Sequence, residues 1–554
     1  MVTPFSSLAL SRPPRGGRQR LLSAQTLALC ALSGVLLIGA FPHLDCAALA
    51  WVALAPLLLT FPHRSWRGAL AAGTVTGIVF FGGLVYWIDV FAAHAVGPVL
   101  GGVAWAGTTL SQAATVTVFA LGAQALARHP RRGAWLLGVP ALWTALEWAR
   151  QFGILGTTWG DLAWTQHRVL PLLQITKLTG PWGLSFLLVF VNGVLAEGGR
   201  EGRGYKTPGR EVLIVRWTKD ILSCVQSTLS SFCRGFYSPG TGVGTVLGAG
   251  LAVTLSLFYG LYTLHTERLR PTFVAAALQG NINQNVTLSP AYTQRVLDTF
   301  AAQSRLARAR GALVTVWPET AVPGYLRYDP HLFAPIAQLA QRNEQTLLVG
   351  ARDYAPAQKK DSNTLFLVTP QGTLAGAYSK QHLVPFGEYV PLHAQFPILD
   401  KLHLSIYDML PGPPHQPLLH APPPIGQVGA AICYDSTYTN LLRAEVAAGA
   451  GLLVVTTDDT WFGRTAAANQ HAAMAAVGAA STDRYLVRCA ATGISQIIDP
   501  TGRVIASAPL FAPAVVSASV QARATRTPYV RFGDWFIVFC ALVIGAALVT
   551  GRRA

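Results

Sequence analysis

Long apolar stretches alternate with short polar loops through the first half of the chain. A membrane-spanning helix needs about 20 mostly apolar residues, and the pattern predicts eight such helices. Seven precede residue 265 and the eighth closes the chain: 24–41, 46–61, 68–91, 96–127, 134–150, 172–197, 242–264 and 534–550. Further apolar segments follow the first one directly, so we do not interpret it as a cleaved signal peptide.

From residue 271 short apolar runs alternate with helical stretches instead. Strand-like runs include ALVTVWPE, TLLVGARDY, VGAAICYD and GLLVVTTDD, and helices are expected near 290–310, 332–343, 439–449 and 466–484. The runs NTLFLVTP and GTLAGAYSK are separated only by Gln371, which predicts a hairpin. The pattern therefore predicts an α/β domain over 265–533, with sheets covered by helices on at least one face. The last helix and a basic tail would occupy 534–554.

Composition and charge agree with a membrane protein that carries a soluble domain. Hydrophobic residues make up 51% and charged residues 12% of the chain, against about 25% charged in soluble domains. This excludes disorder or an ordinary cytosolic enzyme over the whole length. The net charge is +17. The excess lies in short loops rather than in one patch, so we expect no nucleic-acid partner.

The basic residues gather in alternate loops, which is the positive-inside pattern. It predicts that both ends are cytoplasmic and that 265–533 lies outside, with 198–241 as a long cytoplasmic loop. The composition of that loop predicts a solvated and partly disordered segment, and binding to anionic lipid is the alternative. The basic residues that define the inner side are Arg12, Arg15, Arg18, Arg20, Arg64, Arg67, Arg128, Arg131, Arg132, Arg200, Arg203, Lys206, Arg210, Arg216, Lys219, Arg234, Arg552 and Arg553. Arg150, Arg168 and Lys177 are the exceptions on the outer side.

The cysteines predict neither a metal site nor a disulfide framework. Their number is odd, their spacing is scattered, and no CxxC or zinc-type spacing occurs. They are Cys30, Cys46, Cys224, Cys233, Cys433, Cys489 and Cys540. We expect no metal and no cofactor.

Three chemically distinct residues stand where predicted strands end. Glu319 closes ALVTVWPE, Lys380 closes GTLAGAYSK, and Cys433 follows VGAAI. Sites in α/β proteins collect at strand ends. A cysteine nucleophile needs a base to form thiolate and a cation to stabilise negative charge. Taken singly, each has a plain alternative: a buried thiol, a turn residue and a solvated lysine.

WPET, YSKQHLVPFGEYVP and ICYD together resemble the Glu-Lys-Cys triad of the nitrilase superfamily. The chain more narrowly resembles the apolipoprotein N-acyltransferases of the bacterial inner membrane. LAWVALAPLLL, GLVYWI, ALWTALEWAR, LQGNI, DTWFG and GIS…DPTGRV carry that likeness along almost the whole chain. The resemblance implies an eight-helix membrane protein with a nitrilase-like four-layer αββα domain facing the periplasm.

The resemblance also implies a ping-pong acyl transfer. Glu319 would be the proton acceptor, Lys380 would stabilise the oxyanion and Cys433 would be the nucleophile, with Glu388 and Tyr434 in support. The acyl donor would be a membrane phospholipid, and the acceptor would be the α-amine of a diacylglyceryl-cysteine lipoprotein. We expect a monomer in the bilayer.

The chain departs from the family pattern at Leu288, Asp435, Asp458 and Ser481. These changes surround the expected acyl or lipoprotein pocket and put substrate preference in question, so a specialised paralogue is an alternative. Asp89, Glu147 and Asp161 lie toward the predicted outer side of the membrane. They would line a polar path for lipid headgroups, or else extend toward the membrane surface. His94, His167 and His382 receive no role.

Two other functions use the same features. A membrane-anchored nitrilase-type amidase or hydrolase would share the triad and use water as acceptor, although it would need only one helix. A non-catalytic membrane scaffold is disfavoured by the complete triad.

The segment 394–426 is rich in proline and apolar residues. It is long enough to act as a lid over the site, with a mobile surface excursion as the alternative.

Overall fold

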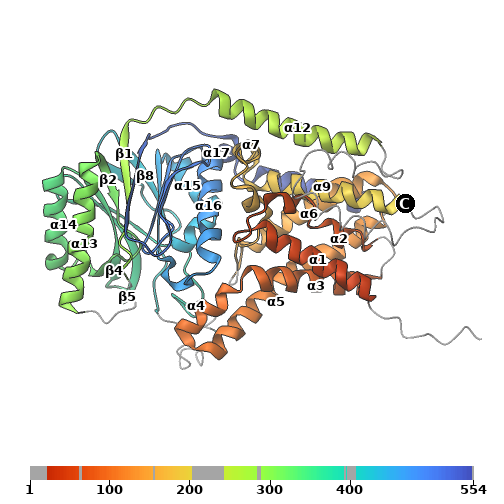
Figure 1. Cartoon of the computed structure of the whole chain (residues 1–554), viewed down its shortest axis with the longest axis horizontal. Helices are drawn as coiled ribbons and strands as arrows, with labels where there is room; N and C mark the ends of the chain where they lie inside the picture. Colours follow the sequence, from red (N-terminus) through yellow and green to blue (C-terminus); the bar gives the residue numbers. More distant parts are fainter. Residues whose placement is uncertain are drawn as a thin grey trace, which may run out of the picture.

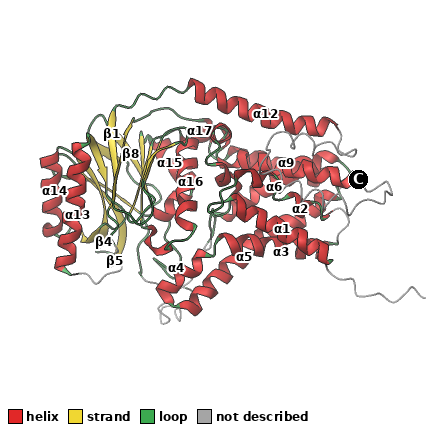
Figure 2. Ribbon diagram, in the orientation of Figure 1, coloured by secondary structure: helices red, strands yellow, loops and turns green. Residues whose placement is uncertain are grey.

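The computed structural model describes residues 22–61, 65–153, 156–201, 243–282, 289–391, 395 and 407–551. A helical half extends to Thr266, and a layered α/β half begins at Phe273 (Figures 1 and 2). Several positions named above lie outside the described residues: Arg12, Arg15, Arg18, Arg20, Arg64, most of 198–241 with Cys224 and Cys233, Leu288, most of 394–406, Arg552 and Arg553.

The helical half is a bundle whose ends follow local sequence signals. Ser23 and Ser65 cap the first turns of their helices with side-chain oxygens. Gly97, at φ +89°, ends α4 (Trp87–Val96) and turns the chain into α5 (Pro98–Ala127). The close packing of α3 on α5 depends on Gly77, where a Cβ would lie 2.8 Å from Cα of Ala113. The other long helices are α1 (Ala24–Ala40), α3 (Trp66–Leu84), α6 (Arg132–Arg150), α9 (Pro181–Glu201), α12 (Val243–Thr266) and α18 (Trp535–Gly551).

Three of the predicted spans are broken. The segment 46–61 forms only the short helices η1 (Ala47–Trp51) and α2 (Ala55–Leu58), and 68–91 divides at Val85 between α3 and α4. The segment 172–197 holds α7 (Leu170–Leu173) and α8 (Thr176–Thr179) before α9, with a bend of 120°. Gly180, at φ +66°, permits that bend.

By length and composition, three described helices could cross a membrane, or four if the bent pair counts as one span. These helices are α3, α5 and α12, while α1 and α18 are apolar but shorter. The α12 helix lies along the outside of the bundle (Figure 1) and exposes Leu251, Leu255 and Phe258. An exposed apolar helix of this kind is suited to lipid contact. The number of spans therefore stays a prediction.

Two mixed sheets form the second half. The first, seven-stranded sheet has the order β13-β1-β2-β4-β5-β6, with β3 paired to β4. Its strands are β13 (Ala514–Val520), β1 (Phe273–Gln279), β2 (Ala312–Val316), β4 (Thr346–Ala355), β5 (Lys360–Val368), β6 (Leu374–Ser379) and β3 (Val322–Tyr325). The antiparallel pairing of β5 with β6 confirms the predicted hairpin.

The second, six-stranded sheet has the order β12-β11-β10-β9-β8-β7. Its strands are β12 (Val504–Ser507), β11 (Gln496–Ile498), β10 (Leu486–Ala490), β9 (Leu452–Thr457), β8 (Gly426–Ile432) and β7 (Leu419–Ala421). The central strands β8, β9 and β10 are parallel. The turns that follow β8 and β9 therefore lie at the same edge of this sheet.

The sheets face one another across an apolar core and are each covered by helices. Helices α13 (Pro290–Ala309) and α14 (Pro330–Asn343) pack on the first sheet. Helices α15 (Thr439–Ala448) and α16 (Ala467–Thr482) pack on the second. This layering is visible in Figures 1 and 2. The predicted covered α/β sheets are confirmed.

Helix α16 belongs to the cores of both halves. Ala475, Ala476 and Ala479 pack toward the second sheet, whereas Met474 and Val477 join the core of the helical half. In Figure 1 the helix lies between the sheets and the bundle. The alanine-rich sequence lets backbones approach closely from both sides.

Four charged side chains bind the two halves where the chain passes between them. Nζ of Lys177 lies 2.7 Å from Asp483 and 3.4 Å from Glu267. Arg523 binds the same two carboxylates at 2.7 and 2.9 Å. Lys177, an exception to the loop-charge pattern, is thus neutralised inside the protein.

Candidate active site

Cys433 begins a tight turn directly after β8. Its φ of +51° lies in the left-handed region, which a residue with a Cβ adopts only when its surroundings impose it. The short helix η5 (Cys433–Thr437) follows, and Oγ of Ser436 donates to the Cys433 carbonyl at 2.7 Å. The turn presents the thiol at the end of a parallel strand, as a nucleophile requires.

Lys380 lies between two carboxylates in an almost closed space. Its Nζ is 3.3 Å from Oε1 of Glu319 and 2.9 Å from Oε1 of Glu388. The Lys380 side chain is 1% exposed. Lys380 follows β6 directly, whereas Glu319 stands three residues beyond the end of β2. The structure thus brings together the strand-end residues Glu319 and Lys380 with Glu388 from the PFGE segment.

Asn363 is a part of this site that the sequence interpretation missed. Its Nδ2 donates to Glu319 at 2.6 Å and to Glu388 at 3.3 Å. It lies near the start of β5 and is 2% exposed. Its only sequence signal is a polar residue at the beginning of a buried strand. Asn363 and Lys380 together keep two like-charged groups at fixed positions.

The charges around Cys433 oppose and assist ionisation at once. Burial raises the pKa of the Cys433 thiol well above its usual range, and Glu319 raises it further. Lys380 and a hydrogen bond from Thr457 act in the opposite direction. The sulfur therefore rests as a thiol, and a base would have to remove its proton before the sulfur could act as a nucleophile.

Lys380 stays charged in spite of its burial. Burial alone would lower the pKa of the Lys380 ammonium, but Glu319 and Glu388 outweigh it and hold that pKa well above its usual range. Burial raises the pKa of Glu388, while Lys380 acts to lower it. A permanent, desolvated cation beside a thiol can stabilise an oxyanion.

Asp435 links the turn that carries Cys433 to the loop that follows Lys380. Its carboxylate accepts from the backbone N–H groups of Gln381 and His382 at 3.2 and 2.6 Å. It also accepts from the Tyr378 hydroxyl at 3.2 Å and is fully buried. Asp435 therefore fixes the backbone after Lys380 relative to the turn that carries Cys433. His382 stacks on the ring of Tyr438 at 4.2 Å.

Tyr434 faces the helical half. Its hydroxyl donates to the Gly156 carbonyl at 2.6 Å, and Tyr438 donates to the same carbonyl at 3.0 Å. The ring of Trp159 stacks on Tyr434 with centroids 6.2 Å apart. A loop between α6 and α7 thus contacts the turn that carries Cys433.

A buried cluster of His471, Asp459 and Arg488 supports the same turn from α16 and the second sheet. Nε2 of His471 lies 3.2 Å from the Cys433 carbonyl, and Nδ1 lies 3.1 Å from Asp459. Arg488 binds the other oxygen of Asp459 at 2.7 Å. Burial would raise the pKa of Asp459, but Arg488 and His471 outweigh it and hold the pKa far below its usual value. Sequence reasoning gave none of these residues a role.

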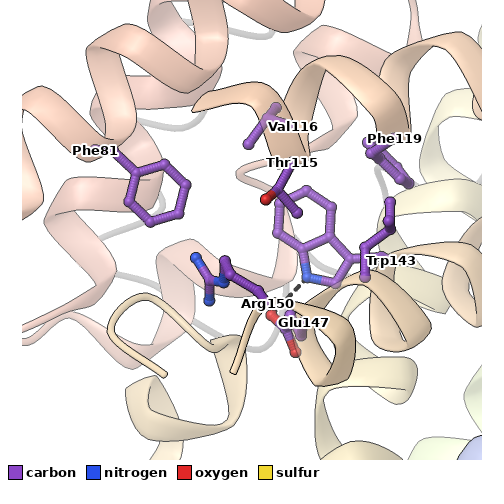
Figure 3. Close-up of a pocket in the computed structure, with 8 residues that line it drawn as sticks. Phe81, Thr115, Val116, Phe119, Trp143, Glu147 and Arg150 are labelled. Atoms are coloured by element: carbon purple, nitrogen blue, oxygen red, sulfur yellow. Dashed lines mark hydrogen bonds between the residues drawn. The ribbon is translucent and has the colours of Figure 1, made fainter. Parts of the chain in front are cut away.

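The acids of the helical half are not arranged as interfacial side chains. Asp161 is fully buried against Arg150, and Glu147 accepts from the Trp143 indole at 2.6 Å (Figure 3). Phe81, Trp143, Glu147 and Arg150 line a narrow pocket between the helices. The alternative that these side chains extend toward the membrane surface is therefore wrong for Glu147 and Asp161, which are both buried. Asp89 is half-buried in α4.

The other departures have different surroundings. Asp458 follows β9, and its backbone N–H donates to Oε2 of Glu319 at 2.7 Å. Ser481 lies buried in α16 and donates to the Gly478 carbonyl.

Only part of the proposed lid is described, mainly 407–426, where the backbone N–H groups of Met409 and Gly412 donate to the backbone carbonyls of Glu388 and Lys380. In the described part of the chain, no group of three or more His, Cys, Asp or Glu could hold a metal ion.

Sequence comparison matches both halves of the chain to known families. Residues 33–194 match the apolipoprotein N-acyltransferase N-terminal domain, and residues 274–529 match carbon-nitrogen hydrolase. Among solved structures, Saccharomyces cerevisiae Nit3 of the nitrilase superfamily is 18% identical with a TM-score of 0.35. The alignment covers 46% of this chain and 92% of the Nit3 chain.

Relatives that match nearly the whole chain are named apolipoprotein N-acyltransferase. An apolipoprotein N-acyltransferase of Geobacter metallireducens is 34% identical, and the alignment covers 94% of both chains. That of Methylococcus capsulatus is 29% identical over 96% of this chain and 97% of the relative. The family resemblance read from the motifs is confirmed: this chain belongs to the apolipoprotein N-acyltransferases.

Proposed function

We propose that the protein moves an acyl chain from a membrane phospholipid, through a thioester on Cys433, to the α-amine of a lipoprotein's N-terminal diacylglyceryl-cysteine. The name of the relatives that match nearly the whole chain, apolipoprotein N-acyltransferase, agrees with N-acylation of a lipoprotein. The observation that carries the proposal is the buried Lys380–Glu319 pair acting on Cys433 at a strand end. Apolar helices attached to that domain would keep it beside both lipid substrates.

In the first half-reaction Glu319 accepts the thiol proton as Cys433 attacks the sn-1 ester. Lys380 stabilises the oxyanion, the C–O bond breaks, and the lysophospholipid leaves with the proton from Glu319. Glu388 and Asn363 hold the Lys380 ammonium and Glu319 carboxylate in place. Tyr434 supports the turn against the helical half.

In the second half-reaction the acceptor amine attacks the thioester carbonyl. A C–N bond forms, the C–S bond breaks, and Glu319 transfers a proton from nitrogen to the leaving thiolate. A thioester retains acyl-transfer potential, so the reaction needs neither ATP nor a cofactor.

For the membrane arrangement we infer eight spans in the bacterial inner membrane, a monomer, and a catalytic domain in the periplasm. The alternating loop charges and the exposed apolar surface of α12 support this. An impermeant thiol reagent on spheroplasts should label Asp408→Cys, at a position whose side chain is 66% exposed, in a chain without its other cysteines. It should not label single cysteines retained at Cys224 or Cys233. The opposite labelling would invert the topology.

The alternative is a hydrolase that passes the same thioester to water. A transferase must keep water from the acyl group until the amine arrives, and the segment 394–426 would act as the shield. Met409 and Gly412 anchor the described part of this segment to Glu388 and Lys380. A lid at this place would close over the site itself.

Mass spectrometry of the intact protein separates these functions. After exposure to phospholipid, wild type should carry one acyl adduct, and Cys433→Ala should carry none, because nucleophile and base act as a unit. The buried Cys489 provides the matched control, since Cys489→Ala should still acylate. The adduct should persist until a diacylglyceryl-cysteine peptide with a free α-amine is added. Equal loss with and without that amine, with release of free fatty acid, would establish the hydrolase instead.

A further inference from the structure

Asp458 occupies a position beside the base that the catalytic roles above do not use. Its backbone N–H binds Oε2 of Glu319 at 2.7 Å, so its carboxyl group emerges from the chain next to the proton acceptor. The residue is 5% exposed. Its Oδ1 accepts from the backbone N–H and the hydroxyl of Thr460. Oδ2 makes no hydrogen bond to the described residues.

Apart from the two hydrogen bonds from Thr460, the surroundings of Asp458 offer its carboxylate no positive charge within the described residues. The charged groups that act on it are Glu319 and Asp459, and Asp459 is already bound to Arg488. Tyr292 of α13 lies close enough for its hydroxyl to sense the Asp458 charge. Within the described ranges no lysine or arginine forms an ion pair with Asp458.

Burial, together with the nearby Glu319 and Asp459 carboxylates, raises the pKa of Asp458 to about 7, although the hydrogen bonds from Thr460 act to lower it. A carboxyl group with this pKa exchanges its proton at neutral pH. It would also gain most from a guest cation, because a buried charge without a partner is costly. The acceptor offers such a cation, since an α-amino group with pKa near 8 is mainly protonated at pH 7.

We propose that Asp458 binds the α-ammonium group of the acceptor beside Glu319 and takes its first proton. This inference rests on the proposed function and adds a residue to its second half-reaction. The ammonium transfers one proton to Asp458, and the neutral amine attacks the Cys433 thioester. As the C–N bond forms and the C–S bond breaks, Glu319 transfers a second proton to the thiolate. Asp458 then releases its proton to solvent.

Asp458→Asn is the sharpest test because it removes the charge and retains an oxygen for Thr460. Acyl-enzyme formed with phospholipid is discharged either by the diacylglyceryl-cysteine peptide or by hydroxylamine, which is uncharged at neutral pH. At pH 7 the ratio of peptide to hydroxylamine discharge rates should fall at least tenfold in Asp458→Asn. The difference should shrink at pH 9, where the free amine predominates. Asp458→Glu should restore part of the ratio, and Asp298→Asn, at an exposed position on α13, should retain all of it.

A second measurement uses the wild-type protein alone, in case Asp458→Asn does not fold or acylate. An α-N,N-dimethyl peptide stays cationic at pH 7 but cannot form a stable amide, whereas the α-N-acetyl peptide is neutral. The dimethyl peptide should inhibit discharge of the acyl-enzyme by the acceptor peptide at a concentration at least fivefold lower than the acetyl peptide requires. Equal inhibition, or an unchanged discharge ratio in Asp458→Asn, would overturn the role of Asp458. Absence of any adduct on wild-type Cys433 would instead overturn the proposed function.

Discussion

Gln470 and His471 are neighbours on α16 and bond to opposite parts of the protein. Oε1 of Gln470 accepts from the indoles of Trp87 and Trp159, at 3.2 and 2.8 Å, in the helical half. Nε2 of His471 lies 3.2 Å from the carbonyl of Cys433, in the turn that follows β8. One turn of helix therefore joins the bundle to the turn that carries Cys433.

Gln470→Met should loosen this joint without changing the size of the side chain. It leaves two buried indole N–H groups and the Pro42 and Leu84 carbonyls without their amide partner. Each unpaired buried group costs about 1–3 kcal/mol, so the thermal unfolding midpoint in detergent should fall clearly. Asn469→Met, on the same helix but half-buried, is the control. Equal midpoints for both variants would contradict the role of Gln470.

Lys380→Arg should fail to support acylation although it keeps the charge. The ammonium fits between Glu319 and Glu388 in a space that leaves 1% of the side chain exposed, and a planar guanidinium has the wrong shape for it. Lys380→Met should fail through loss of the charge. The adduct mass at Cys433 after phospholipid treatment measures both. Lys360→Arg is the control: Lys360 is partly exposed and pairs with Asp408, so this variant should acylate normally. A normal adduct in Lys380→Arg would show that charge alone suffices.

Asn363→Leu should slow thioester formation while Cys433 remains intact. Two carboxylates lose a shared donor, and a loss of about 1–3 kcal/mol corresponds to roughly 5–150-fold in rate. Stopped time points read by mass spectrometry give the rate. Asn343→Leu, at the end of α14, is a control on the far side of the first sheet. An unchanged rate would show that Lys380 alone orients Glu319.

Lys177→Met should destabilise the junction of the two halves by about 3 kcal/mol. It leaves Asp483 and Glu267 to share Arg523 in a space where Asp483 is 6% exposed. Adding Asp483→Asn should recover part of the loss, because the second change removes the unpaired charge. Unfolding midpoints of the single and double variants decide this. Strictly additive losses would mean that the ion pair contributes nothing.

Asp458 should make stability fall as pH rises. Burial raises its folded-state pKa from 3.8 to about 7. Between these values the unfolded chain has lost the proton and the folded chain keeps it, so unfolding becomes easier up to about pH 7 and then levels off. Asp458→Asn lacks this term. The difference in midpoint between variant and wild type should grow from pH 5 to pH 8, and a constant difference would contradict the buried acid.

Sequence reasoning found Glu319, Lys380 and Cys433 because each stands at or just beyond a strand end, where local pattern and chemistry coincide. It could not find Asn363 or His471, because their partners come from segments distant in sequence and meet only in the folded layers. The broken helices had a similar cause. Hydropathy measures apolar content, and 46–61 is apolar because it packs inside the bundle, where Leu54 and Leu57 are fully buried. Length alone did not reveal its breaks.

The shared position of α16 has a consequence for how the molecule folds. Its residues Ala467 and Val477 complete the core of the bundle, and Ala475 and Ala479 complete that of the sheets. Neither half can form its full interior while the other is unfolded. The polypeptide should therefore melt as one cooperative unit. A fragment cut at 265 and 533 would expose the bundle-facing side of α16 to water and should aggregate rather than behave as an independent enzyme.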